Sequence, residues 1–223
     1  MPKARNKSRF RLSKTELLLL LIAVIFLGYA FLHLQDWYSH TQGTAAPPDN
    51  SRTVTDSPVK PDEKPVPPGV TYNVPADQPK ILRIVSIGLE GLIQKVGENR
   101  QHEIGTPTNV NYAGWFTGSA KPGETGLSII DGHVSGRYST ALFAKLAKLQ
   151  KGAFVIIQFG DNSLRSFEVI DKRELPKNQA SQFLLQKRAD VNAQLNLITC
   201  GGAFDKNSHQ YNNRVVVVTR RVY

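Results

Sequence analysis

The chain has 223 residues and a formal net charge of +10 at pH 7, which leaves room for one substantial domain with appendages. About half of that charge lies in the first sixteen residues, where six Lys and Arg side chains accompany a single Glu. No zinc-finger or RNA-binding sequence pattern accompanies the rest, so the sequence argues against nucleic acid as a partner.

An uncharged, mostly apolar run of 18 residues follows at 17–34. A helix of that length spans about 27 Å, close to the hydrocarbon thickness of a bilayer. The basic tail at 1–16 predicts a cytoplasmic N-terminus and an extracellular remainder. A cleaved signal peptide is the alternative, but its apolar core would be shorter, and the Thr-Ala-Ala sequence at 44–46 lies ten residues beyond the run. We therefore expect a retained single-pass anchor, with Trp37 and Tyr38 at the membrane interface.

The segment at 35–80 is rich in proline: nine of the thirteen prolines of the chain fall at 41–80. Such a sequence favours extended, polyproline-like conformations and acts as a semi-rigid spacer. We expect an extracellular stalk at 35–80 that holds a folded domain, residues 81–223, away from the membrane.

From residue 81 onward, short apolar runs are separated by turn residues, which is typical of a mainly β fold. The expected strands lie at 81–87, 92–96, 127–131, 154–159, 164–171, 195–199 and 214–219. Apolar residues at helical spacing predict a short helix at 140–149, and a second is expected around 181–187. Many short strands with few helices favour a closed or nearly closed β-barrel.

The chain has one cysteine, Cys200, at the end of an apolar strand. A single cysteine cannot form an intramolecular disulfide, and a free cysteine often acts only as a small buried hydrophobe. His133, however, also follows an apolar strand, and Arg214 opens the last one. If the three strand ends meet at one rim, they bring together the groups that a thiol acyl-transfer enzyme needs.

These residues resemble the sortase family. The resemblance rests on Leu197-Ile198-Thr199-Cys200, Gly132-His133 and Arg214 before a run of valines, and it includes Ala113-Gly114-Trp115-Phe116, residues 118–123 and Asp131-Gly132-His133. It covers the chain from about residue 82 to the C-terminus. The short motifs are most similar to single-domain sortases of class F or class E.

The resemblance implies a closed eight-stranded sortase-type β-barrel with one or two short helices, preceded by the transmembrane helix. It also implies a cysteine transpeptidase of the cell membrane that cleaves Leu-Pro-x-Thr-Gly-like sorting signals between Thr and Gly. The acyl group would then pass to an amine of a cell-wall precursor or pilin, or to water.

In that reading the Cys200 thiolate attacks the Thr carbonyl carbon, and His133 protonates the leaving amine. Arg214 would stabilise the developing oxyanion, although Asn212 occupies another possible position for that group. Two residues are assigned to substrate binding: Thr199 would orient the site through its hydroxyl, and His209 would line the cleft.

Other classes remain open. An L,D-transpeptidase would carry His immediately before a Gly-Cys pair, and a papain-like protease would place Cys before His in the sequence; this chain does neither. A membrane-tethered β-barrel that binds a wall or protein ligand without chemistry would also fit the anchor, stalk and barrel. Neither a cofactor nor a metal is expected, because the Cys, His and acidic residues show no ligand spacing.

Overall fold

The computed structural model describes residues 61–67, 71–99 and 103–222. The basic tail expected at 1–16 and the transmembrane helix expected at 17–34 lie outside these residues, as does most of the expected stalk. Among the described residues, no helix is both long enough and apolar enough to cross a membrane.

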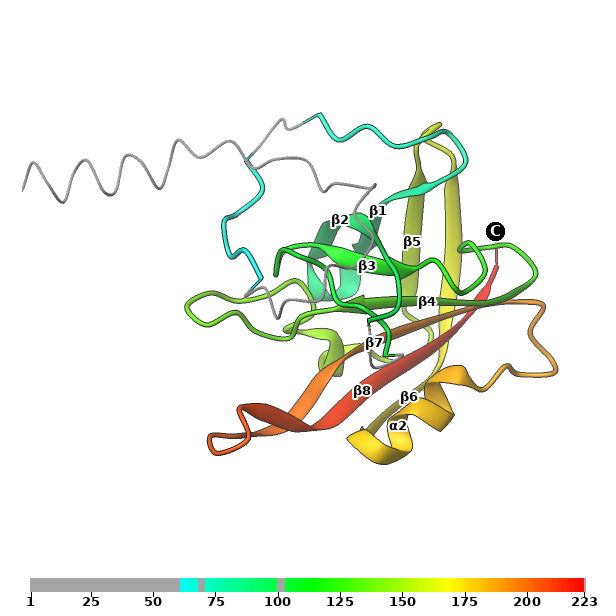
Figure 1. The fold of residues 1–223 in the computed structure, drawn as a ribbon. Helices are drawn as coiled ribbons and strands as arrows, with labels where there is room; N and C mark the ends of the chain where they lie inside the picture. Colours follow the sequence, from blue (N-terminus) through cyan, green and yellow to red (C-terminus); the bar gives the residue numbers. More distant parts are fainter. Residues whose placement is uncertain (1–60, 68–70, 100–102, 223) are drawn as a thin grey trace, which may run out of the picture. The chain divides into compact units, whose positions relative to one another are not determined.

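Eight strands form a closed barrel in the order β1-β2-β3-β4-β7-β8-β6-β5 (Figure 1). Their bounds are β1 Pro79–Ile84, β2 Leu89–Val96, β3 Ala113–Phe116, β4 Gly126–Gly132, β5 Phe154–Phe159, β6 Leu164–Pro176, β7 Ala193–Asp205 and β8 Gln210–Arg221. One α-helix, α2 (Lys177–Leu185), and two 3-10 helices, η1 (Val85–Ile87) and η2 (Leu146–Lys148), complete the described elements. The mainly β, closed eight-stranded barrel expected from the sequence is confirmed.

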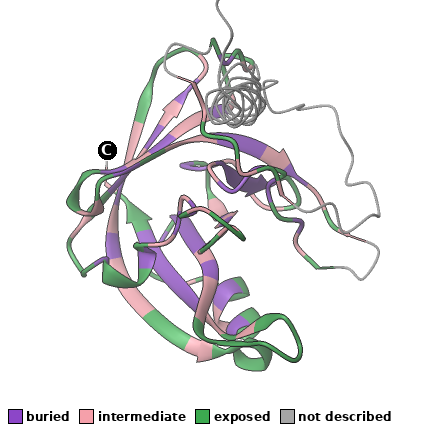
Figure 2. Cartoon of the chain, turned by 90° about the vertical axis from the view of Figure 1, so that its left-hand side faces the viewer, coloured by how far each residue is buried: buried purple, intermediate pink, exposed green. Residues whose placement is uncertain are grey.

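Apolar side chains fill the barrel and also cover part of its outer surface. Along β8, Val215 and Val217 belong to the interior cluster, whereas Val216 packs outside with Ala180 and Leu184 of α2. Successive side chains of a strand point to opposite faces, so a strand covered on both faces needs consecutive apolar residues. The run of valines that begins at Val215 is thereby explained, and Figure 2 shows how the buried residues follow the strands.

The seven strands expected from the sequence all form, most of them with longer bounds; the exception is the strand expected at 81–87, since β1 ends at Ile84 and the last three of those residues form η1. The sequence pattern missed β3, which has only four residues, all of them buried. A strand buried on both faces lacks the alternation of apolar and polar residues by which a half-buried strand is recognised. The helix expected around 181–187 is present as α2 and begins earlier, directly after Pro176.

The helix expected at 140–149 is wrong: the segment makes successive turns that end in η2. Phe143, Leu146 and Leu149 are fully buried in the interior cluster. They are spaced three residues apart, which is the period of a 3-10 turn and puts all three side chains on one side of the segment. The sequence pattern gave the buried face correctly but the wrong period.

The described part of the expected stalk packs against the barrel. Tyr72 is only 2% exposed, and its hydroxyl donates a hydrogen bond to the Ile93 carbonyl of β2 (2.7 Å). Further upstream, Asp62 forms a parallel bridge with Asn109. The folded unit around the barrel therefore includes residues before position 81.

We expect Phe143→Ala to lower the free energy of unfolding by about 3–5 kcal/mol, because it removes a fully buried aromatic side chain and leaves a cavity. Phe143 is 0% exposed, whereas Leu164, the control position, is 58% exposed. Leu164→Ala should change stability by no more than about 0.5 kcal/mol. Urea unfolding of the full chain in detergent micelles measures both, and equal losses would contradict this account of the core.

Candidate active site

Strand β7 carries Cys200 between β4 on one side and β8 on the other. In the register of β7 with β8, Cys200 lies directly opposite Arg214, and directly opposed residues of neighbouring strands project from the same face. The thiol and the guanidinium therefore share the outer face that also carries Ile198 and Val216. Asn212, the alternative to the arginine, is exposed and lies beyond this pair toward the hairpin tip.

The Arg214 guanidinium is held by the backbone of its own hairpin. Nη1 donates hydrogen bonds to the carbonyls of Tyr211 (2.9 Å) and Asn213 (2.8 Å). Both bonds that Arg214 makes within the described residues use this one nitrogen. The other N–H groups can therefore face the outer surface beside Cys200.

His133 is the first residue after β4, which runs parallel to β7. The register pairs Asp131 with Ile198, and the Thr199 hydroxyl donates to the Gly132 carbonyl (2.7 Å). Carried to the next residues, this register sets His133 level with Cys200 at the same end of the two strands.

The His133 ring is fixed by a loop carbonyl: Nε2 lies 2.9 Å from the oxygen of Pro107. A carbonyl oxygen can only accept, so Nε2 carries the hydrogen, and Nδ1 is the nitrogen left for proton transfer. Burial lowers the pKa of His133, and the Pro107 contact opposes this effect. The imidazole is therefore neutral near pH 7.

Glycine is required next to the histidine for steric reasons. A Cβ atom on Gly132 would come within 2.7 Å of the Phe143 ring. In addition, the Phe143 N–H donates to the His133 carbonyl (3.0 Å). The Gly-His pair is thus tied to the turn segment that closes the barrel interior.

Asp131, two residues before the histidine, is a member of the site that the sequence reasoning missed. Its Oδ1 accepts the Gly132 N–H (2.7 Å), and burial raises the pKa of Asp131 to about 7, an effect opposed by that hydrogen bond and by Arg214. The sequence shows Asp131 as a carboxylate at the end of an apolar strand, within the Asp131-Gly132-His133 motif, but this pattern alone predicts no role for it.

Burial also raises the pKa of the Cys200 thiol. The positive charge of Arg214 lowers this pKa, and the charge of Asp131 raises it. Burial is the largest of these effects, so the thiol of the free protein is protonated near pH 7. The resting site accordingly pairs a neutral thiol with a neutral imidazole.

The two residues assigned to substrate binding lie in very different places. Thr199 is 2% exposed, and its hydroxyl bond to the Gly132 carbonyl links β7 to the end of β4. His209 lies in the turn of the β7–β8 hairpin, at a positive φ of 53° and edge-on to the Phe204 ring. At about 3.3 Å per residue, the five residues from Cys200 to the end of β7 separate the turn from the thiol by roughly 16 Å. The structure therefore does not bring His209 to Cys200.

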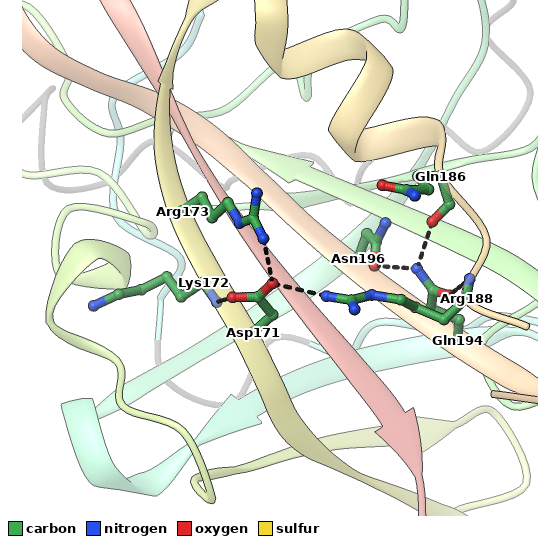
Figure 3. A network of polar contacts seen from close by, with 7 residues as sticks. All are labelled: Asp171, Lys172, Arg173, Gln186, Arg188, Gln194 and Asn196. Carbon is green, nitrogen blue, oxygen red and sulfur yellow. Dashed lines mark hydrogen bonds and ion pairs between the residues drawn. The ribbon is translucent and has the colours of Figure 1, made fainter. Parts of the chain in front are cut away.

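Helix α2 and the segment after it pack along the same outer face of the barrel. Asn196 donates through Nδ2 to the Leu184 carbonyl (2.6 Å). Gln194 donates through Nε2 to the Gln186 carbonyl (3.0 Å; Figure 3). Both amides lie on β7, the strand that carries Cys200. Helix α2 and the segment after it are thereby fixed to the strand that bears the thiol.

Charged groups extend this network toward β6. The Asp171 carboxylate lies 2.7 Å from Arg188 and 3.4 Å from Arg173 (Figure 3). At the opposite end of α2, Lys177 lowers the pKa of Cys200. The first residue of the helix thus contributes positive charge to the site.

Metal ligands are not clustered in the part of the chain that the structure describes: no three His, Cys, Asp or Glu side chains there could hold one ion.

Arg220 and Arg221 lie at the far end of β8, where Arg220 forms an ion pair with Glu168 (2.8 Å).

Comparison with known proteins identifies a family for this fold. A family model described as a sortase domain matches residues 82–222. Sortase A from Corynebacterium diphtheriae is 21% identical, with a TM-score of 0.50 over 67% of this chain and 63% of that one. Its lid mutant is 22% identical, with a TM-score of 0.50 over 65% and 70% of the two chains.

A sortase D5 transpeptidase from Clostridium perfringens is 21% identical, with a TM-score of 0.48 over 66% of this chain and 80% of that one. No curated protein sequence matches this chain.

The charges around the thiol predict opposite effects of two substitutions. Arg214→Gln should raise the pKa of Cys200, because it removes a positive charge that favours the thiolate, and Asp131→Asn should lower it. The pH dependence of the rate of iodoacetamide alkylation, followed by mass spectrometry of the full chain, gives the pKa. An unchanged pKa of Cys200 in both variants would show that the charges of Arg214 and Asp131 do not affect the thiol.

Proposed function

This chain belongs to the sortase family, and we propose that it is a membrane-anchored cysteine transpeptidase that cleaves Leu-Pro-x-Thr-Gly-like sorting signals after Thr. The observation that carries the proposal is the strand register, which pairs Cys200 with Arg214 and brings the end of β4, with His133, alongside β7. The motif resemblance favours class F or class E.

In the acylation step, the Cys200 sulfur attacks the Thr carbonyl carbon while its proton passes to Nδ1 of His133. The N–H groups of Arg214 stabilise the negative charge on the carbonyl oxygen. The tetrahedral intermediate collapses as the C–N bond breaks, and Nδ1–H protonates the departing glycine amine. The product is a thioester on Cys200 and a neutral imidazole.

In the second step, an amine of a cell-wall precursor or pilin attacks the thioester and gives a proton to His133. The C–S bond breaks, the new amide forms, and the sulfur regains its proton from the imidazole. Water in place of the amine would give hydrolysis. Throughout both steps, Nε2–H of His133 stays bonded to the Pro107 carbonyl, which keeps Nδ1 directed at the reaction.

Because Cys200 and His133 are both uncharged at rest, they and Arg214 act at different stages of the reaction. A thiol with a raised pKa is protected from ionisation until a base accepts its proton. Arg214 then acts mainly on the transition state, since its charge does not overcome the effect of burial on the resting thiol. Thr199 serves this scheme as a positioning residue through its bond to Gly132.

The rest of the chain would hold the barrel at the outer surface of the membrane. We propose that 17–34 anchors the protein with its N-terminus in the cytoplasm and that the segment after it carries the barrel outside. Sorting-signal proteins on the same surface would then reach the outer face beside α2.

The function is tested by incubating the full chain, in detergent micelles, with a panel of Leu-Pro-x-Thr-Gly-like peptides, with and without amine acceptors. Cleavage after Thr should vanish in Cys200→Ala, and Arg214→Ala should lower kcat by about 10²–10³-fold because an oxyanion donor is lost. Mass spectrometry identifies both the cleaved and the ligated products.

Arg220→Ala is the matched control, since Arg220 lies on the same strand and pairs with Glu168; it should retain activity. Peptide binding without cleavage by the wild type would favour the non-catalytic binding barrel. Unchanged cleavage by Cys200→Ala would overturn the mechanism.

A further inference from the structure

A short piece of the expected stalk is bonded to the loop that precedes β3. The Asp62 N–H donates to the Thr108 carbonyl (2.7 Å), and the Val110 N–H donates to the Asp62 carbonyl (2.8 Å). The side-chain amide of Asn109 adds a hydrogen bond to the Lys64 carbonyl (3.1 Å). The residues at 62–64 thus pair with the chain immediately after Pro107.

The Glu63 carboxylate, between these backbone bonds, occupies the turn that follows His133. It accepts the N–H groups of Arg137 (2.5 Å) and Tyr138 (2.9 Å) and the hydroxyl of Ser139 (2.9 Å). Successive N–H groups that converge in a turn form a concave site for an anion, and bonds to an ionised carboxylate are among the strong ones.

The turn is shaped for this carboxylate. A Cβ atom on Gly136 would lie 2.6 Å from Glu63 Oε2 and 2.7 Å from Ser139 Oγ. Any larger residue at 136 would therefore compete with Glu63 for the same space. The hydrogen bonds, that of the Tyr138 N–H most of all, lower the pKa of Glu63, so the carboxylate is ionised at neutral pH.

The two loops held by this segment are the two that flank the imidazole. One contains Pro107, whose carbonyl accepts the Nε2 hydrogen of His133. The other begins directly after His133 and closes on itself through the Gly136 N–H and the Ser139 carbonyl (2.9 Å). Residues 62–64 therefore connect the loop that bonds the ring with the turn that follows His133, although they lie outside the matched family domain at 82–222.

We propose that Glu63 is a positioning residue for His133: the stalk segment at 62–64 clamps the Pro107 loop and the 135–139 turn together, and so fixes the imidazole for proton transfer. This inference rests on the proposed function only for its effect on turnover. The orientation of the ring is a property of the free protein and can be measured without substrate.

The first test is the pKa of His133, read from the ring signals in NMR spectra of the histidine-labelled full chain in micelles and assigned with His133→Asn. The Pro107 contact raises the pKa of His133, so Glu63→Gln should lower it by loosening that contact. A residue that only stabilised the fold would lower the melting temperature without moving this titration.

The second test is turnover of a Leu-Pro-x-Thr-Gly peptide. Glu63→Gln should lower kcat by about tenfold with KM nearly unchanged, because small misplacements of a catalytic group slow the chemical step. Glu63→Asp, which keeps the charge, should recover part of the loss. Glu168→Gln, which removes a carboxylate paired with Arg220 at the far end of β8, is the matched control and should change neither quantity.

A third variant addresses the same contact from the other side. Gly136→Ala should displace the carboxylate and reproduce the shift in the His133 titration, and the double variant should shift it no further. An unchanged His133 pKa in both Glu63→Gln and Gly136→Ala would overturn the clamp. If Glu63→Gln shifts the His133 titration but the wild-type chain cleaves no sorting peptide, the clamp stands and the proposed function is overturned.

Discussion

Strand β7 determines where each group of the candidate site lies, because it is hydrogen-bonded to β4 along one edge and to β8 along the other. The antiparallel edge sets Cys200 opposite Arg214, and the parallel edge, with the bond from Thr199 to Gly132, sets the end of β4 beside it. A register slip of one residue would turn a strand's side chains to the other face. Such a slip in β8 would turn Arg214 toward the interior, where Val215 and Val217 are buried, so the packing of the core is what specifies the site.

Burial of the site also sets its chemistry at rest. The same environment that raises the pKa of Cys200 lowers that of His133 and raises that of Asp131. Each shift favours the uncharged form, as desolvation requires. Arg214 remains a fixed positive charge beside the thiol. Positive charge is therefore available for a carbonyl oxygen that becomes negative, while the nucleophile is ionised only as its proton is transferred.

The sequence was sufficient for the barrel, because short apolar runs reveal its strands, whereas the roles of Cys200, His133 and Arg214 stay predictions. The expectation that Cys200 ends a strand and that Arg214 opens one is wrong, because β7 and β8 continue past the apolar runs into a polar hairpin. The sequence was insufficient where the signal was short or belonged to another period: β3 has four buried residues, and 140–149 has the spacing of a 3-10 turn. Asp131 and Glu63 were missed for a different reason. Their roles depend on partners distant in sequence, and a carboxylate in a proline-rich segment looks like any solvated charge until the turn that it fills is seen.

Intact-mass spectrometry of the acyl-enzyme tests the central claim most directly. The full chain is mixed with a Leu-Pro-x-Thr-Gly peptide, quenched in acid within one turnover, and weighed. The account predicts a mass increase equal to the acyl group that ends at Thr, located on Cys200 and released by hydroxylamine as a thioester should be. Cleavage of the peptide with no adduct on Cys200 would show that another group is the nucleophile and would contradict the account.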